Sequence, residues 1–239
     1  MKLSTYRHPS AFTSDGRPLP MKDYILYKCL GSFKAFVRAN DYVIGGHLAF
    51  DGFWEPHVTM AFIDLLDAPG WPANPTFCDL GANSGYYSMI ASHLGFRATA
   101  IEADPENVKL LRMNAKMCGR SFHVIQGVVG SKGLRADVIV DPISSNSSFV
   151  LSPAGSIPAV KVPEADVYKI DLEGGDEAVI QEIMARLTQP KQIFFEYAPQ
   201  RYAQSPNYIL DHFMVYETRS RVRIHTLPLQ ETDLILQPK

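Results

Sequence analysis

One stretch decides the fold: Asp79-Leu80-Gly81-Ala82-Asn83-Ser84-Gly85. It follows an apolar run at residues 76–80 that is typical of a buried strand, and it precedes a helical pattern at residues 86–94. Glycines at such a turn let the backbone approach a ligand closely, and the helix start beyond them offers free N–H groups. The spacing differs from the G-x-G-x-x-G of dinucleotide binders, whose glycines serve a pyrophosphate. The stretch therefore predicts a ligand-binding turn of a different kind.

The chain around this turn alternates between short apolar runs and helical patterns. Strands are predicted at residues 76–80, 98–102, 122–126, 167–172 and 193–197, and helices at residues 86–94, 105–118 and 176–187. Such alternation is typical of a parallel sheet that helices cover on both faces. We therefore expect an α/β fold with a mostly parallel central sheet, in which ligands bind at the carboxyl ends of the strands.

Prolines and glycines between residues 69 and 75 mark a break in the chain. We expect residues 1–74 to form a helical and loop cover, and residues 75–239 to form the main domain. We also expect a helix at residues 56–67 and a loop at residues 141–163. Edge strands are expected at residues 222–227 and 233–236.

The charge balance and the apolar pattern narrow the range of partners. The formal net charge is -2, whereas strong non-specific nucleic-acid binding needs a large positive field, so no nucleic-acid partner is expected. The densest basic cluster, Arg219, Arg221 and Arg223, is interpreted as a solvated strand or loop rather than an anion site. No apolar run approaches the roughly 20 residues of a membrane span, so no membrane partner is expected. Three widely spaced cysteines favour reduced thiols in the cytoplasm over a disulfide framework or a zinc site.

Polar residues stand at the ends of the first three predicted strands. Asp79 ends the first strand, and its charge favours a ligand with a positive group near the turn, such as the ammonium and sulfonium of S-adenosylmethionine (SAM). Glu102 ends the second strand, where a carboxylate can accept both hydroxyls of a ribose. Gln126 ends the third strand and can reach an adenine. The three positions together predict a site for SAM.

Carboxylates also follow the fourth and fifth predicted strands. Asp171 and Glu173 are two positions apart, so on a strand they share a face, and the expected sheet order places the fourth strand beside the first. Asp171 and Glu173 are therefore candidate general bases toward a hydroxyl, and Asp171 with Glu196 is a candidate site for a divalent cation such as Mg²⁺. Glu173 fits equally well as an acid at the start of the following helix. His57, which follows Trp54-Glu55, is a second candidate base.

Four segments together resemble one protein family. They are CDLGANSGYYSMIA (78–91), AIEADPENVKLLRMNAKMCG (100–119), YKIDLEGGDEAVIQEI (168–183) and IFFEY (193–197). In this order they resemble the FkbM family of SAM-dependent methyltransferases, over roughly residues 50–200. The resemblance implies a class I, Rossmann-like methyltransferase fold and methylation of a hydroxyl oxygen on a sugar or a small natural product.

The resemblance also implies a set of cofactor-binding residues. These are Asp79, Gly81, Asn83, Gly85 and Glu102, with Glu55 reaching the methionine end of the cofactor. The stretch before residue 167 and the tail after Glu196 depart from the family's pattern. Both regions are expected to shape the pocket for the methyl acceptor.

Three other functions fit parts of the pattern. An RNA-directed methyltransferase shares the fold, but enzymes that methylate amino groups usually carry Asn/Asp-Pro-Pro-aromatic after the fourth strand, where this chain reads Asp-Leu-Glu-Gly (171–174). A non-catalytic SAM-binding protein is a second alternative, and the complete set of cofactor-site residue types argues against it. A nicotinamide-dependent oxidoreductase ranks last, because the sequence lacks the glycine fingerprint of that class.

Overall fold

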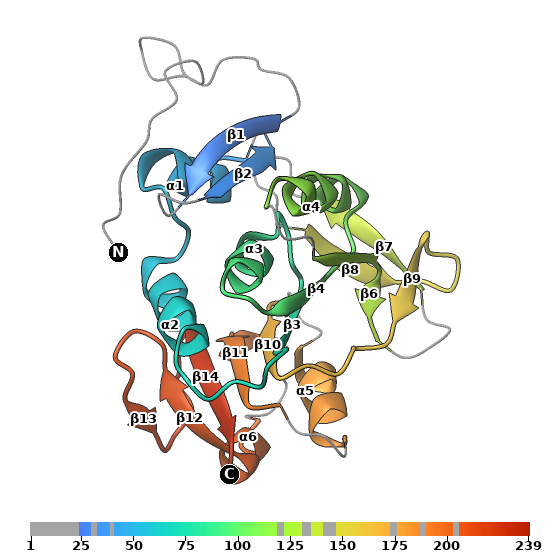
Figure 1. Ribbon diagram of the computed structural model, residues 1–239. Helices are drawn as coiled ribbons and strands as arrows, with labels where there is room; N and C mark the ends of the chain where they lie inside the picture. Colours follow the sequence, from blue (N-terminus) through green and yellow to red (C-terminus); the bar gives the residue numbers. More distant parts are fainter. Residues whose placement is uncertain are drawn as a thin grey trace.

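The computed structural model describes residues 24–29, 33–38, 41–118, 122–130, 135–140, 147–172, 176–186, 190–202 and 206–239. Within these residues, a large twisted sheet runs through the middle of the molecule with helices on both of its faces (Figure 1). No helix in the described ranges is long and apolar enough to cross a membrane.

The central sheet has the strand order β13-β12-β14-β11-β10-β3-β4-β5 in the described part of the chain. Its parallel strands are β3 (Thr76–Leu80), β4 (Arg97–Glu102), β5 (His123–Gln126), β10 (Val167–Ile170) and β11 (Gln192–Tyr197). The chain steps outward from β3 to β5 and then returns to place β10 on the other side of β3. This reversal is the point at which open α/β sheets bind ligands. The predicted α/β fold with a mostly parallel sheet is confirmed.

Three antiparallel strands at the C-terminal end extend the sheet: β12 (Phe213–Glu217), β13 (Arg223–Ile224) and β14 (Thr232–Pro238). The last strand, β14, is inserted between β11 and β12. The prediction of an edge strand at residues 233–236 was therefore wrong. The run Leu234–Leu236 is buried throughout, because neighbouring strands flank it on both sides and it takes part in the core on both faces.

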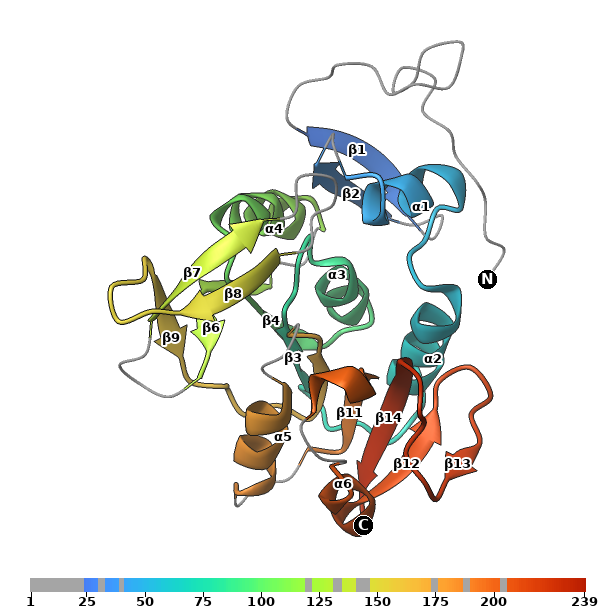
Figure 2. The same ribbon diagram turned by 180° about the vertical axis from the view of Figure 1, so that it is seen from behind.

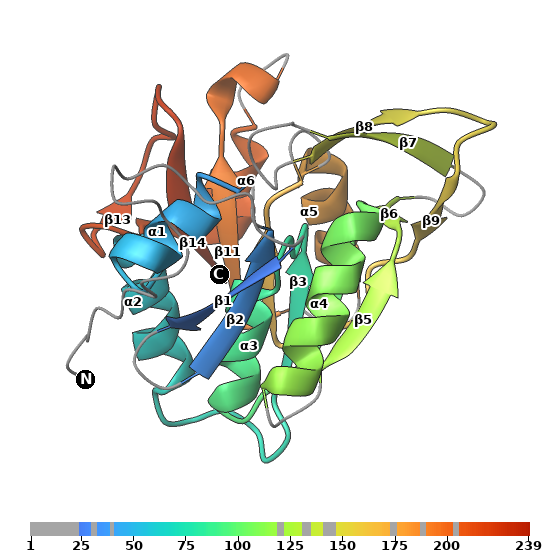
Figure 3. The same cartoon turned by 90° about the horizontal axis from the view of Figure 1, so that it is seen from above.

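Helices cover the two faces of the sheet in separate groups. One face carries α2 (Pro56–Leu66), α3 (Tyr86–His93) and α4 (Pro105–Met117), and the other carries α5 (Asp176–Met184) and the short α6 (Tyr208–His212). Figures 1 and 3 show this two-sided arrangement. As the sequence predicts, α4 begins with Asp104 as its N-cap, which accepts a hydrogen bond from the N–H of Glu106, and with Pro105 in its first turn.

The N-terminal part contains a β-hairpin that the prediction of a helical and loop cover missed. β1 (Tyr24–Cys29) pairs antiparallel with β2 (Phe33–Arg38), and α1 (Ile44–Phe50) follows them. Residues of β2, α1 and α2 share one core with the sheet. The helices therefore agree with the expectation, whereas the hairpin is an addition to it.

A second small sheet lies beside β5 and has the order β6-β9-β7-β8 (Figure 2). Its strands are β6 (Val128–Val129), β7 (Arg135–Val140), β8 (Ser147–Leu151) and β9 (Ile157–Val160). The prediction of a loop at residues 141–163 was wrong for β8 and β9. These strands are short and contain serine or proline, so their apolar pattern was too brief to indicate a sheet.

Asn114 of α4 joins three parts of the structure and is fully buried. Its Oδ1 accepts a hydrogen bond from the N–H of Phe36 on β2 at 2.6 Å. Its Nδ2 donates to the carbonyl of Phe36 at 3.0 Å and to the carbonyl of Ser84 in the glycine-containing turn at 2.7 Å. One side chain thus ties the hairpin to the turn that the sequence singles out.

We predict that Asn114→Ala lowers the free energy of unfolding by about 2–4 kcal/mol, because three backbone groups lose their hydrogen-bond partner. Urea denaturation followed by circular dichroism measures the change. Lys116→Ala on the exposed side of the same helix is the matched control, with an expected change within about 0.5 kcal/mol. Equal stability of the two variants would contradict this role of Asn114.

Candidate cofactor pocket

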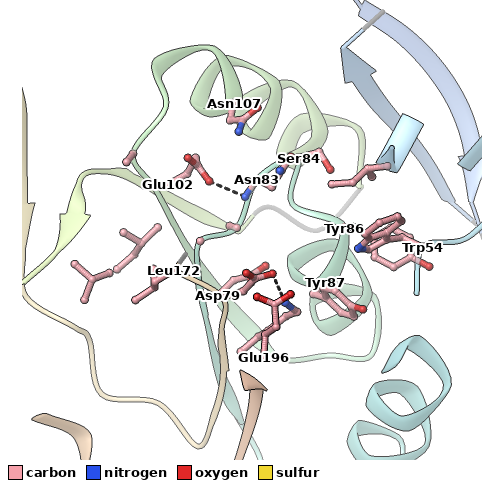
Figure 4. A pocket seen from close by; sticks show the side chains of 18 of the residues that line it. Trp54, Asp79, Asn83, Ser84, Tyr86, Tyr87, Glu102, Asn107, Leu172 and Glu196 are labelled. Carbon is pink, nitrogen blue, oxygen red and sulfur yellow. Dashed lines mark hydrogen bonds and ion pairs between the residues drawn. The ribbon is translucent and has the colours of Figure 1, made fainter. Parts of the chain in front are cut away.

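A pocket opens at the carboxyl ends of the parallel strands, on the side where the order of the strands reverses. Its walls come from the turn after β3, the ends of β4, β10 and β11, residues 127–129, and the N-terminal residues Ile44, Trp54 and Glu55. Figure 4 shows Glu102 on one side of the turn and the rings of Trp54, Tyr86 and Tyr87 on the other. The pocket is therefore elongated along the turn, with a polar end at β4 and an aromatic end at α3.

Two glycines shape the turn between β3 and α3. Gly81 has φ +80, and a Cβ atom there would lie 1.8 Å from the carbonyl oxygen of Asp171. Gly85 has φ +85, and a Cβ atom there would lie 2.5 Å from Cδ2 of Leu111. A side chain at either position would be strained and would collide, so glycine lets the turn pack against both β10 and α4. Gly81 lines the pocket, whereas Gly85 supports it from behind.

The N–H groups of the turn bind within the protein. Gly81 and Ala82 both donate to the carbonyl of Ile101 at 3.0 Å, and Asn83 donates to the carboxylate of Glu102 at 2.8 Å. These donors of the turn are therefore occupied. What the turn offers a ligand is close approach of its backbone.

Glu102 ends β4 and is 6 % exposed. One carboxylate oxygen accepts from the N–H of Asn83 and the other accepts from the N–H of Asp104, each at 2.8 Å. A further backbone hydrogen bond comes from Ala103. A carboxylate has about four acceptor positions, so Glu102 keeps acceptor capacity for a ligand in the pocket. Burial raises the pKa of Glu102 to about 7, and the nearby charge of Asp104 adds to this effect while the backbone hydrogen bonds oppose it. Two parallel hydroxyl donors, such as those of a ribose, match the two oxygens of this carboxylate.

Asp79 and Lys169 form the floor of the pocket on adjacent strands. They are register partners of β3 and β10, and both side chains are almost fully buried. Burial raises the pKa of Asp79 to about 6, while the positive charge of Lys169 and the hydrogen bond from Ser88, at 2.6 Å, oppose the rise. Burial disfavours the charged form of Lys169, but the carboxylates of Asp171, Glu55 and Asp79 outweigh it and raise its pKa above the usual value. Lys169 is therefore a permanent cation among acids.

The acids around Lys169 come from separate elements of the fold. The ammonium of Lys169 lies 3.0 Å from Asp171, which directly follows β10, and 4.9 Å from the centre of the Tyr87 ring. Tyr87 donates a hydrogen bond of 2.6 Å to Glu55, the residue before α2, whose φ is +40. These contacts hold Glu55 at the aromatic end of the pocket, where it faces Lys169.

Glu196 and Asp233 complete the acidic row on β11 and β14, where they are register partners. Burial raises the pKa of Glu196 to about 8, and the neighbouring Asp171 raises it further, while Lys169 and Arg201 oppose the rise. Burial likewise raises the pKa of Asp233 to about 6, with Glu55 adding to the effect. Carboxylates outnumber cations in this part of the pocket, which therefore favours a positively charged ligand group.

The predicted site residues fall into three groups. Those that line the pocket are Glu55, Asp79, Gly81, Asn83, Glu102, Asp171 and Glu196. Gly85, Gln126 and His57 do not line it. Gly127, the neighbour of Gln126, does, and His57 instead lies 3.4 Å from Asp233. Glu173 lies outside the described residues.

The carboxylates suggested for a divalent cation have other partners. Lys169 contacts Asp171 at 3.0 Å, and Arg201 contacts Glu196 at 2.9 Å. No group of three or more potential metal ligands occurs within the described residues. The side chains described at this position fit a metal ion poorly, because each of the two carboxylates suggested as ligands already pairs with a cation of its own.

The sequence reasoning missed Lys169, which lines the pocket, and Asp233, which lies next to the pocket residue Glu196 on β14. A lysine in the middle of the apolar run Val167–Ile170 is an unusual residue for a buried strand, and this was the signal available for Lys169. Asp233 is found only through the insertion of β14 beside β11, a long-range pairing for which the local sequence carries no signal.

The comparisons with known proteins bear on the fold. No protein-family model matches the sequence, and no curated protein matches it significantly. Among solved structures, a dimethyladenosine transferase from Plasmodium falciparum is similar with a TM-score of 0.51 at 12% identity, over 77% of this chain and 62% of that one. The tRNA (uracil-54, C5)-methyltransferase of Pyrococcus abyssi, in complex with S-adenosyl-L-homocysteine, has a TM-score of 0.53 at 10% identity, over 98% of this chain and 49% of that one.

A third similar structure is the tRNA m1G37 methyltransferase of M. jannaschii, with a TM-score of 0.51 at 11% identity, over 92% of this chain and 57% of that one. This chain thus spans between 49% and 62% of the lengths of the three proteins. Identities this low bear on architecture alone. The protein has the Rossmann-like fold of methyltransferases.

Proposed function

We propose that this protein is a SAM-dependent methyltransferase. The observation that carries the proposal is Glu102, a buried carboxylate at the end of the second parallel strand that lines the pocket and is held by backbone N–H groups of the turn and of the start of α4. In nucleoside-binding α/β folds, an acid at this position accepts the ribose hydroxyls. The ribose of SAM would lie against Glu102, and its adenine would lie between Asn107 and residues 127–129.

The charges at the other end of the pocket support a cationic cofactor. Asp79 and Glu55 line the pocket near the turn, and one lysine balances several acids there. An ammonium group and a sulfonium are both favoured by such surroundings, whereas the pyrophosphate of a dinucleotide is opposed. When bound, SAM supplies a methyl group on a good leaving group, so the protein must chiefly align the acceptor and exclude water.

We propose a hydroxyl oxygen as the methyl acceptor, in line with the sequence resemblance to the FkbM family. Glu196 is our candidate proton acceptor for this step: it lines the pocket, pairs with Arg201, and has a pKa that burial raises to about 8, which makes it more basic than a free carboxylate. Asp171, which the sequence made the first choice for the base, forms an ion pair with Lys169. We assign it the role of orienting the side chain of Lys169. Removing the hydroxyl proton as the methyl is transferred would leave a neutral methyl ether.

An RNA acceptor is the second candidate, because the similar solved structures include tRNA methyltransferases. The acids Glu55, Asp171 and Glu196, which line the pocket, oppose a polyanion. A neutral or cationic acceptor fits these charges better, which places RNA second.

The first prediction concerns cofactor binding, measured by isothermal titration calorimetry with SAM and S-adenosylhomocysteine. Wild-type protein should bind both with micromolar affinity. Glu102→Ala should weaken binding by about 10-fold or more, since two charge-assisted hydrogen bonds are lost. Asp79→Asn should lower the affinity for SAM more than the affinity for 5′-methylthioadenosine, a fragment that keeps the ribose.

Glu164→Ala, at a partly exposed loop position outside the pocket, is the control and should leave the affinity unchanged. Absence of binding to folded, ligand-free wild-type protein would refute the proposed function. Binding without any methyl transfer to the acceptors below would instead support the non-catalytic alternative.

The second prediction concerns the acceptor. Incubation with SAM carrying a trideuterated methyl group, in the presence of a panel of monosaccharides, phenols, amines and a tRNA transcript, should label an oxygen of a small hydroxylated compound. For that compound, Glu196→Gln should lower kcat by about 100-fold because the proton acceptor is lost. The affinity of this variant for S-adenosylhomocysteine should stay within about 2-fold of the wild-type value.

Mass spectrometry locates the label, and the pH profile of kcat identifies the titrating group. Label found in the tRNA transcript, with the small molecules untouched, would favour the RNA-directed alternative. An unchanged kcat in Glu196→Gln would exclude Glu196 as the proton acceptor.

A further inference from the structure

The N-terminal hairpin reaches the nucleoside end of the pocket through Arg38, the last residue of β2. The guanidinium of Arg38 is an ion-pair partner of Asp104, and both residues are buried, with exposed fractions of 8 % and 1 %. Nε of Arg38 is buried and has no hydrogen-bond partner among the described residues. Asp104 is therefore the contact that compensates the burial of this cation in the described structure.

Asp104 in turn contacts the carboxylate that faces the pocket. Its backbone N–H donates to one oxygen of Glu102 at 2.8 Å, and its side chain caps α4 by accepting from Glu106. The negative charge of Asp104 raises the pKa of Glu102. Arg38 forms an ion pair with Asp104, so its positive charge is placed to offset the charge of Asp104.

Among the described residues, the other groups that act on Glu102 are uncharged. Asn83 contributes its backbone N–H, and Gln126 is the register partner of Glu102 on β5. The charges of Arg38 on β2 and Asp104 at the start of α4 are thus the ones that we expect to set the pKa of Glu102. Strand β2 also holds the turn itself, through Phe36 and Asn114.

We propose that Arg38 is a positioning residue for the nucleoside end of the pocket: by pairing with Asp104 it keeps Glu102 ionised and in place to accept ribose hydroxyls. This inference rests on the proposed function. An ionised Glu102 accepts from backbone N–H groups and from ribose hydroxyls, whereas a protonated carboxyl must use one oxygen as a donor and loses an acceptor position. Affinity for a ribose-containing ligand should therefore rise with pH.

The test is the affinity for 5′-methylthioadenosine between pH 6 and pH 9, by isothermal titration calorimetry. This probe has the ribose and adenine of SAM without its ammonium and carboxylate, so it does not report on Asp79 or Glu55. With the pKa of Glu102 at about 7, wild-type affinity should rise about 10-fold from pH 6 to pH 8 and then level off. Arg38→Gln should shift the midpoint upward by about 0.5–1 pH unit, with about 3-fold weaker binding at pH 7 and convergence with wild type at pH 9.

Two further variants separate this role from a purely structural one. Asp104→Asn keeps an N-cap residue and the backbone donor, and it should shift the midpoint downward in otherwise wild-type protein. In the Arg38→Gln background, the same change should restore the wild-type midpoint. Lys34→Gln removes one positive charge from an exposed position of the same strand and should change nothing.

The outcomes distinguish this inference from the proposed function. If wild type binds neither 5′-methylthioadenosine nor S-adenosylhomocysteine, both fail together. If wild type binds but Arg38→Gln keeps the wild-type pH profile, the positioning role of Arg38 is wrong while the proposed function stands. The same conclusion follows if Arg38→Gln loses affinity equally at every pH and Asp104→Asn does not rescue it. Should Arg38→Gln not fold, an unchanged midpoint in Asp104→Asn alone overturns the inference.

Discussion

The carboxylate of Glu102 is the constraint on which the pocket depends. It accepts from Asn83 in the turn after β3 and from Asp104 at the start of α4, so one buried side chain joins the two backbone segments that enclose the nucleoside end. A buried acid is costly unless it is hydrogen-bonded, and here both oxygens are engaged while the carboxylate keeps acceptor capacity for a ligand. The glycines at positions 81 and 85 matter for the same reason, because they let the turn pack closely enough for Asn83 to reach Glu102.

The sequence allowed the parallel half of the fold to be predicted, together with the residues that gather at the carboxyl ends of its strands. Their signals are local: apolar runs of strand length, the Asp104-Pro105 helix start, and polar residues such as Asp79 and Glu102 at strand ends. Parallel strands bring their carboxyl ends to one edge, so residues far apart in the chain can be placed together from their positions on strands alone. This is why seven of the predicted site residues line one pocket.

The acceptor end was harder to predict because it depends on long-range pairing. Asp233 reaches the pocket region through the insertion of β14 between β11 and β12, and the hairpin reaches Glu102 through Arg38 and Asp104. Lys169 carries a charge that changes the character of the site, since it compensates acids that would otherwise suit a metal ion. Local periodicity carries no signal for the two long-range contacts, whereas the lysine within an apolar run was a signal for Lys169. The methyl acceptor is accordingly the part of the function that relies most on experiment.

A crystal structure of the complex with S-adenosylhomocysteine at pH 8, where Glu102 is ionised, tests the central claim most directly. The account predicts both ribose hydroxyls within about 3.2 Å of the two oxygens of Glu102, and the sulfur directed toward Asp171 and Glu196. A ribose bound away from Glu102, or a ligand outside the pocket at the carboxyl ends of the strands, would contradict it.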